Sequence, residues 1–173
     1  MPAVPDASPL IALSKMERLD LLALVHGQVI LTPSVWNESV TQGKALGARD
    51  AGALERYAQG QPFSRARLTR RELALVNRLR ETARIGLGEA EVLAVAKSRN
   101  ALAVLDEKGA RSIAVSLGIP HTGTAGLLFE AFLQRLITYE ELAQHLEYLG
   151  GILWVSSELL AGILRKAREV EQR

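Results

Sequence analysis

The stretch Ala101-Leu102-Ala103-Val104-Leu105-Asp106 is decisive for the fold class, because five apolar residues in a row end on a carboxylate. A short continuous apolar run of this kind is typical of a strand buried on both faces of a parallel sheet. A weaker run, Ala3-Val4-Pro5, also ends on an aspartate, Asp6. Ligands of open parallel sheets bind beyond the carboxyl ends of the strands, so both aspartates are expected at such a site.

Strand-like and helix-like segments alternate on either side of these runs, which favours a layered α/β fold with a mainly parallel sheet. We expect strands over residues 3–5, 29–31, 101–105, 119–121 and 152–155. We expect helices over residues 8–24, 33–40, 87–99, 107–117, 124–135 and 138–148, and from Ser156 or Ser157 to the end. Residues 43–84 predict helices with an irregular joint at 60–62 and no strong strand. With no linker or repeat, residues 1–173 predict one domain, with a core of about 1–135 and a strand–helix extension of about 136–173.

The amino-acid composition limits the covalent cross-links and metal sites that the chain can form. The 173 residues, 48% of them hydrophobic, can supply one full core. The absence of cysteine excludes disulfides and thiolate metal sites, and the three histidines are too scattered for a zinc motif. Any metal must therefore rely mainly on oxygen ligands. No signal peptide or apolar stretch of membrane-spanning length is evident, so we expect a cytoplasmic protein with no membrane partner.

Two further acids, Glu38 and Glu89, stand near the starts of predicted helices. If the fold gathers them with Asp6 and Asp106, the four form a site for a hard cation such as Mg²⁺ or Mn²⁺. Two like charges 4 Å apart repel by about 4 kcal/mol at an effective dielectric constant of about 20. The cluster should therefore bind metal or carry a raised carboxyl pKa. The simpler alternatives are helix capping by either aspartate and a solvated Glu38.

Several motifs together resemble those of the PIN-domain family, in particular its VapC-like members. The matching pieces are spread in order over about the first 130 residues: Val4-Pro5-Asp6-Ala7-Ser8-Pro9-Leu10-Ile11-Ala12-Leu13, Pro33-Ser34-Val35-Trp36-Asn37-Glu38, Gly88-Glu89-Ala90-Glu91, Leu105-Asp106 through Arg111, and Thr122-Gly123-Thr124-Ala125-Gly126. The last 40 or so residues resemble the tail of one PIN-like branch that carries the GEAE motif.

The resemblance implies a three-layer α/β/α domain and a ribonuclease that cleaves single-stranded RNA with Mg²⁺ or Mn²⁺. The RNA partner is expected to be single-stranded or structured. It also implies catalytic metal ligation by Asp6, Glu38, Glu89 and Asp106, and a toxin held by a cognate antitoxin, as in VapBC-like pairs. A homodimer is expected as well. The competing hypothesis is a PIN-like fold kept as an RNA-binding or protein-interaction module with weak catalysis.

Glu89 and Glu91 cannot face one site equally, because residues two apart on a helix point to roughly opposite sides. The family register places Glu89 in the ligand position and leaves Glu91 as a possible outer ligand. Many PIN proteins carry aspartate at this position, so the longer glutamate changes the metal geometry but keeps the ligand chemistry.

Residues expected around the acids are polar or basic. Ser8, Thr122 and Thr124 could each orient an acid or simply cap a helix. Lys108 and Arg111 are well placed for a scissile phosphate. Seven arginines between residues 65 and 84, Arg70 and Arg71 among them, could follow an RNA backbone or form a solvated helix face. The apolar stripe of the last helix predicts either packing on its own domain or a dimer or antitoxin groove.

Overall fold

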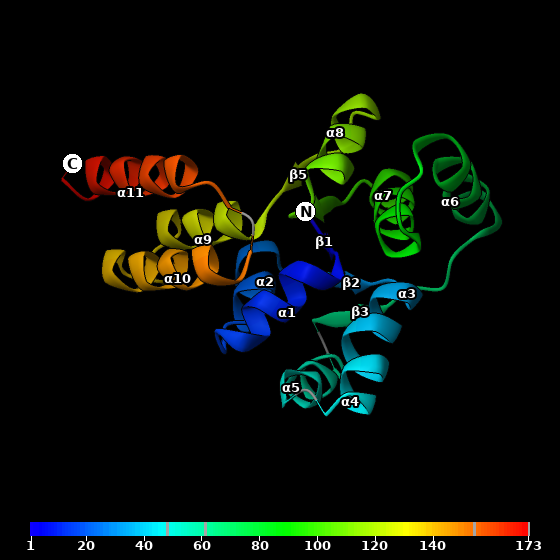
Figure 1. Cartoon of the computed structure of the whole chain (residues 1–173), viewed down its shortest axis with the longest axis horizontal. Helices are drawn as coiled ribbons and strands as arrows, with labels where there is room; N and C mark the ends of the chain where they lie inside the picture. Colours follow the sequence, from blue (N-terminus) through cyan, green and yellow to red (C-terminus); the bar gives the residue numbers. More distant parts are fainter. Residues whose placement is uncertain (48, 61, 154, 173) are drawn as a thin grey trace.

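The computed structural model describes residues 1–47, 49–60, 62–153 and 155–172, and it shows a three-layer α/β/α domain around a parallel sheet (Figure 1). Each neighbouring pair of strands is parallel, in the order β3-β2-β1-β4-β5. The strands are β1 (Ala3–Pro5), β2 (Val29–Leu31), β3 (Phe63–Arg65), β4 (Leu102–Val104) and β5 (His121–Thr122). The expected fold class is thus confirmed.

The sheet is centred on β1, whose residue Ala3 is in register with Val29 of β2 and Leu102 of β4. β1 and β2 are buried at every position, as expected of strands covered on both faces. Because such strands need no polar face, their sequences read as short apolar runs.

Helices cover both faces of the sheet. On one face, α7 (Leu87–Arg99) packs against β1 and β4, flanked by α6 (Arg70–Ala83) and α8 (Lys108–Ser116). On the other face lie α1 (Ala7–Lys15), α2 (Asp20–His26) and α9 (Thr124–Leu133), and α10 (Tyr139–Ile152) and α11 (Ser157–Glu171) pack beyond α9. Between β2 and β3 the chain forms α3 (Pro33–Trp36), the π-helix η1 (Asn37–Gln42), α4 (Gly43–Ala45) and α5 (Arg49–Tyr57).

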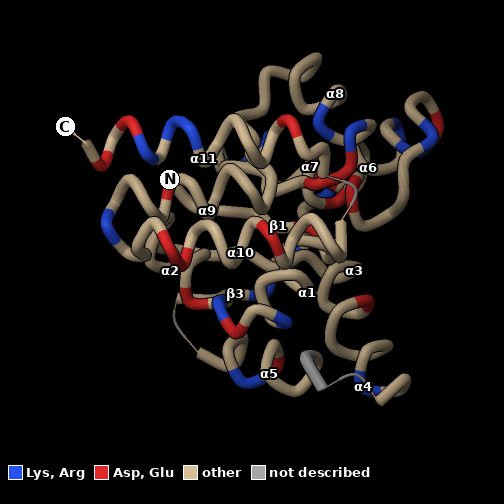
Figure 2. Tube along the Cα trace, turned by 60° about the vertical axis from the view of Figure 1, so that its left-hand side comes forward, with Lys and Arg blue, Asp and Glu red and all other residues tan. Residues whose placement is uncertain are grey.

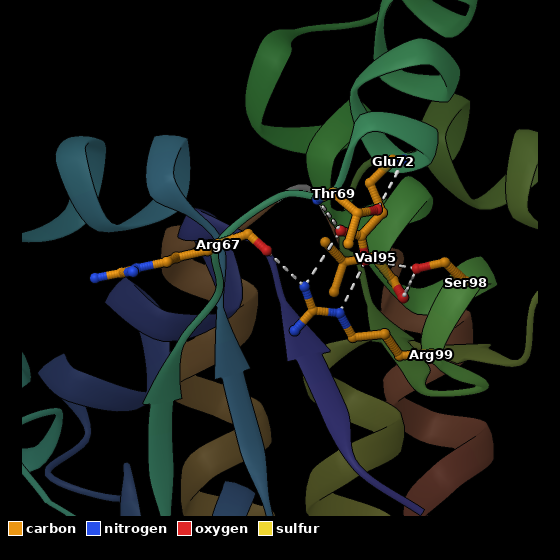
Figure 3. A network of polar contacts seen from close by, with 6 residues as sticks. All are labelled: Arg67, Thr69, Glu72, Val95, Ser98 and Arg99. Atoms are coloured by element: carbon orange, nitrogen blue, oxygen red, sulfur yellow. Dashed lines mark hydrogen bonds and ion pairs between the residues drawn. The ribbon is translucent and has the colours of Figure 1, made fainter.

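A buried carboxylate fixes the α6–α7 hairpin (Figure 3). Glu72 is 1% exposed and accepts hydrogen bonds from Arg99 Nε at 2.8 Å, from Ser98 Oγ at 2.5 Å and from the Thr69 N–H at 2.7 Å. Burial alone would raise the pKa of Glu72, but these hydrogen bonds outweigh it and hold the pKa at about 2. The network anchors the C-terminal end of α7, whose other end carries Glu89 and Glu91.

The first half of the chain departs from the sequence prediction in three places. The expected helix over 8–24 is two helices, because Glu17 adopts a left-handed φ of 56° between α1 and α2. The first of them begins at Ala7, directly after Asp6 at the N-cap position, whose side chain makes no capping hydrogen bond. Ser8 and Pro9 therefore lie inside its first turn. The strand β3 was not expected, since only Phe63 of its three residues is buried.

The predicted strand over 152–155 is wrong in its described part. α10 continues through Gly150 and Gly151 to Ile152, and the Leu153 N–H still donates to Leu149 O at 2.9 Å. Backbone hydrogen bonding within the helix therefore outweighs the apolar, strand-like sequence. Residue 154 lies outside the described part of the chain. The extension after residue 135 is accordingly a pair of helices, and the second starts as predicted, with Ser156 Oγ accepting from the Leu159 N–H at 3.2 Å.

Candidate active site

Two of the four acids lie at the carboxyl edge of the sheet, between β1 and β4. Asp6 follows β1 directly, and its N–H donates to Val104 O of β4 at 3.0 Å. Asp106 follows β4 after one intervening residue. The chain builds the sheet outward from β1 to β3 and then returns to add β4 and β5 on the other side. This reversal is a topological switch point, where open α/β sheets bind ligands.

Three acids line one cavity next to this edge. The cavity has a volume of about 630 Å³, and its lining includes Asp6, Glu38 and Glu89. Two of the carboxylates converge on Gly88, where a Cβ would stand 3.3 Å from Asp6 Oδ1 and 3.8 Å from Glu38 Oε2. A glycine at this position therefore lets the first turn of α7 approach both carboxylates closely.

Glu38 reaches the cavity from the π-helix η1 and is exposed. Asn37 and Gln42 of the same π-helix also line the cavity. Isolated π-helical turns occur frequently at functional sites, and the wider turn brings all three of these polar side chains to one side. The amides of Asn37 and Gln42 were not expected from the sequence, which carries no local signal for π-helical winding.

Burial and neighbouring negative charge make the ionisation of Asp6 costly. Burial raises the pKa of Asp6 from its ordinary value of 3.8 to about 6, and the charges of Glu89, Glu38 and Asp106 add to the rise. A hydrogen bond from the Ala7 backbone acts in the opposite direction but is too weak to cancel it. A nearby cation would stabilise the ionised form of this carboxylate.

Asp106 is held by the start of α9. Its Oδ1 accepts from the Thr124 N–H at 2.8 Å, and its Oδ2 accepts from Thr124 Oγ1 at 2.7 Å. Thr124 is fully buried, so these bonds fix the orientation of Asp106. Gly123 lies against the same carboxylate, because a Cβ there would stand 3.0 Å from Asp106 Oδ1. Thr122 makes no such contact, and its hydroxyl donates to Gly123 O at 3.4 Å.

Glu89 and Glu91 have different surroundings. Glu89 faces the cavity, and its Oε2 accepts from the Gly86 N–H at 2.9 Å, which also caps α7. Glu91 is only 5% exposed, and its Oε2 accepts from the Ser34 N–H at 2.8 Å. The Glu91 carboxylate thereby supplies the cap that the Thr32 side chain does not give to α3. Glu91 connects α7 to the segment that carries Glu38.

A family model described as PIN domain (DUF3368) matches residues 2–169. The chain belongs to the PIN-domain family. No curated protein and no solved structure matches it significantly. PIN domains are typically nucleases, which are hydrolases, and they generally use divalent metals.

The acids of this PIN domain suit a cation that keeps part of its water shell. Among the described residues, no three His, Asp or Glu side chains are close enough to hold one ion directly. Mg²⁺ is usually bound through one or two carboxylates, with waters and substrate phosphates completing its octahedron. An electrostatically strained Asp6 beside Glu38 and Glu89 fits that mode better than a closed cage of protein ligands.

Polar and basic side chains lie on the other side of Asp106. Ser8, Lys108 and Arg111 line a second groove together with Asp106. Ser8 is exposed in the first turn of α1, and Lys108 opens α8. These three residues therefore line one groove with Asp106, although Ser8 was expected beside Asp6.

The arginines of α6 lie farther from the cavities described above. Arg70 and Arg71 open α6 and are exposed, and neither lines the two grooves beside the acids. Figure 2 shows Lys and Arg on α6 and α8, on the same side of the PIN domain as α7. Within the described part of the chain, every helix is too short or too polar to cross a bilayer.

Proposed function

We propose that this chain is a divalent-metal-dependent endoribonuclease that cleaves single-stranded RNA. The observation that carries the proposal is the single cavity lined by Asp6, Glu38 and Glu89 at the switch point of the sheet, where burial and neighbouring charge strain Asp6. The Asp6 carboxylate and the two glutamates beside it in an open cavity supply the oxygen ligands that a hard cation needs for phosphodiester hydrolysis.

Each acid has its own part in the proposed reaction. Asp6, Glu38 and Glu89 hold Mg²⁺ or Mn²⁺, directly or through waters. When bound, such an ion supplies a nucleophilic water and neutralises charge on the phosphate. Asp106, oriented by Thr124 through both carboxylate oxygens, would orient waters of the bound ion.

Positive charge beside the acids supports a nucleic-acid substrate. Lys108 and Arg111 adjoin Asp106 and make no ion pair with any described acid. Their charges are therefore free to bind the phosphates that flank the scissile bond. Arg70 and Arg71 extend the positive surface along α6 for the rest of the strand.

The toxin part of the proposal rests on the VapC-like resemblance. A ribonuclease of this kind should arrest growth when it is produced without its antitoxin. Induction of the wild-type chain should reduce viable counts by at least about tenfold, whereas Asp6→Asn should not. Growth arrest by both chains alike would remove nuclease activity as the cause.

The metal assignment is tested by comparing three glutamates. Glu89→Gln should weaken Mn²⁺ binding by at least about tenfold and abolish RNA cleavage. Glu91→Gln should lower stability by up to about 1 kcal/mol, because a neutral amide caps α3 less strongly than a carboxylate, with a smaller loss of Mn²⁺ affinity. Glu147→Gln, an exposed site on α10, is the charge-matched control and should change neither. If Glu89→Gln bound Mn²⁺ and cleaved RNA like Glu147→Gln, the proposed site would be wrong. Absence of cleavage by the wild-type chain itself would instead favour a non-catalytic binding module.

A further inference from the structure

The groove beyond Asp106 is larger than the cavity lined by Asp6, Glu38 and Glu89, and it leads away from the acids toward α11. Its volume is about 860 Å³, within the range of about 300–1,000 Å³ that is common for small-molecule sites. It begins at Asp106 and Ser8 and passes the start of α9. Its far wall includes Leu159 and Ile163 of the last helix.

The two ends of the groove differ in chemistry. The end at Asp106 carries the cationic side chains Lys108 and Arg111. Arg111 points to the same place as the acid, because a Cβ at Gly123 would stand 3.5 Å from Arg111 Nη1 and 3.0 Å from Asp106 Oδ1. A phosphate held here would therefore lie beside the proposed metal site.

The other end of the groove is apolar and contains an aromatic ring. Phe129 of α9 lines it and is half-buried, and its ring stacks on Phe132 with 6.4 Å between centroids and 22° between planes. Leu159 is 49% exposed although it belongs to a helix that otherwise packs on α9 and α10. Aromatic and apolar walls of this kind accept the face of a nucleobase.

We propose that this groove is a nucleotide subsite that receives the base and ribose next to the scissile phosphate, with α11 as the wall that sets base preference. The proposal rests on the proposed ribonuclease function and names where one substrate nucleotide binds. A nucleotide matches the groove in order: its phosphate meets Lys108 and Arg111, and its base meets Phe129 and Leu159.

A substitution that fills the groove with a larger side chain tests the proposal. Leu159→Trp adds a large side chain at an exposed position of the far wall. Val170→Trp is the matched control, because Val170 lies on the same helix, is 45% exposed and lines a different cavity. Both variants should retain the circular dichroism and the Mn²⁺-induced thermal shift of the wild-type chain.

Two readouts separate this proposal from the ribonuclease proposal. The first is the binding of AMP, CMP, GMP and UMP in the presence of Mn²⁺, measured by calorimetry. We expect unequal affinities for the four, weakened at least about tenfold by Leu159→Trp and unchanged by Val170→Trp. The second is the base frequency beside the cut in a random single-stranded RNA pool, which Leu159→Trp should flatten.

Each outcome has a defined meaning. Nucleotide binding that depends on Leu159 would support the subsite even if the wild-type chain failed to cleave RNA. Cleavage with a base preference and nucleotide affinities unaltered by Leu159→Trp would overturn the subsite and leave the ribonuclease standing. Absence of binding by all four nucleotides, together with no base preference, would also overturn it and assign the groove to a protein partner.

Discussion

Replacing Asp6 by asparagine should make the metal-free protein more stable above pH 6, although it removes a residue of the proposed active site. The pKa of Asp6 is raised from 3.8 to about 6 in the folded chain. One pKa unit corresponds to about 1.36 kcal/mol, so ionised Asp6 costs the folded state up to about 3 kcal/mol. Asparagine keeps the shape of the protonated form and removes this cost.

The sign follows from proton linkage. Below about pH 3.8 Asp6 is protonated in both the folded and the unfolded chain, and the two proteins should be equally stable. Between pH 3.8 and 6 the folded chain keeps the proton that the unfolded chain loses, so the wild type loses stability as pH rises. Above pH 6 the two proteins should differ in their free energy of unfolding by the full amount of about 1–3 kcal/mol. The lower value allows for relaxation of the folded chain around the charge and for screening by salt.

The assay is urea unfolding at pH 4 and pH 8, with EDTA or with Mn²⁺. In EDTA at pH 8, Asp6→Asn should unfold at higher urea than the wild type, and at pH 4 the difference should shrink to about 0.5 kcal/mol. Mn²⁺ at a hundred times its dissociation constant should stabilise the wild type by about 2.7 kcal/mol and the variant by much less. A variant less stable than the wild type at pH 8 in EDTA would refute the claim that the ionised Asp6 carboxylate is strained.

Further predictions concern the scaffold, the RNA path and the partner. Arg99→Met should lower the free energy of unfolding at pH 7 by about 3 kcal/mol, because it leaves the buried carboxylate of Glu72 without its cation; a loss below about 0.5 kcal/mol in urea unfolding would contradict this. The double variant Arg70→Ala and Arg71→Ala should reduce the slope of log affinity against log salt for single-stranded RNA by about 1.4, at about 0.7 per phosphate contact. An unchanged slope would mean that both arginines are only solvated. Analytical ultracentrifugation should show a homodimer at micromolar concentration, and a monomer would remove that expectation.

The central strands could be predicted because each is a run of contiguous apolar residues, which indicates burial on both faces of the sheet. β1 and β4 are short apolar runs, and each is followed within two residues by an aspartate at the switch point. The edge strand β3 could not be predicted, since Ser64 and Arg65 are held there by pairing with β2 and not by burial. In the same way, Glu17 separates α1 from α2 through backbone conformation alone.

The residues of the candidate site differ in the same way: some could be predicted from local sequence, and others depend on contacts that are distant along the chain. Asp6 and Asp106 follow from strand ends, whereas the position of Glu38 needed the family motif and the π-helix that carries it has no sequence signal. The difference between Glu89 and Glu91 depends on Ser34, which lies 57 residues from Glu91 along the chain. The Thr69–Glu72 capping box follows the Thr-x-x-Glu spacing. Its third partner, Arg99, is a long-range contact that no local pattern indicates.

The central claim is that Asp6, Glu38 and Glu89 surround a divalent cation. The most direct test is a crystal structure of the protein soaked in Mn²⁺, with an anomalous difference map. We predict a peak in the cavity lined by these three acids, in contact with at least one of their carboxylates and lost in Asp6→Asn crystals. A saturating soak with no peak in that cavity, or a peak that persists in Asp6→Asn, would contradict the account.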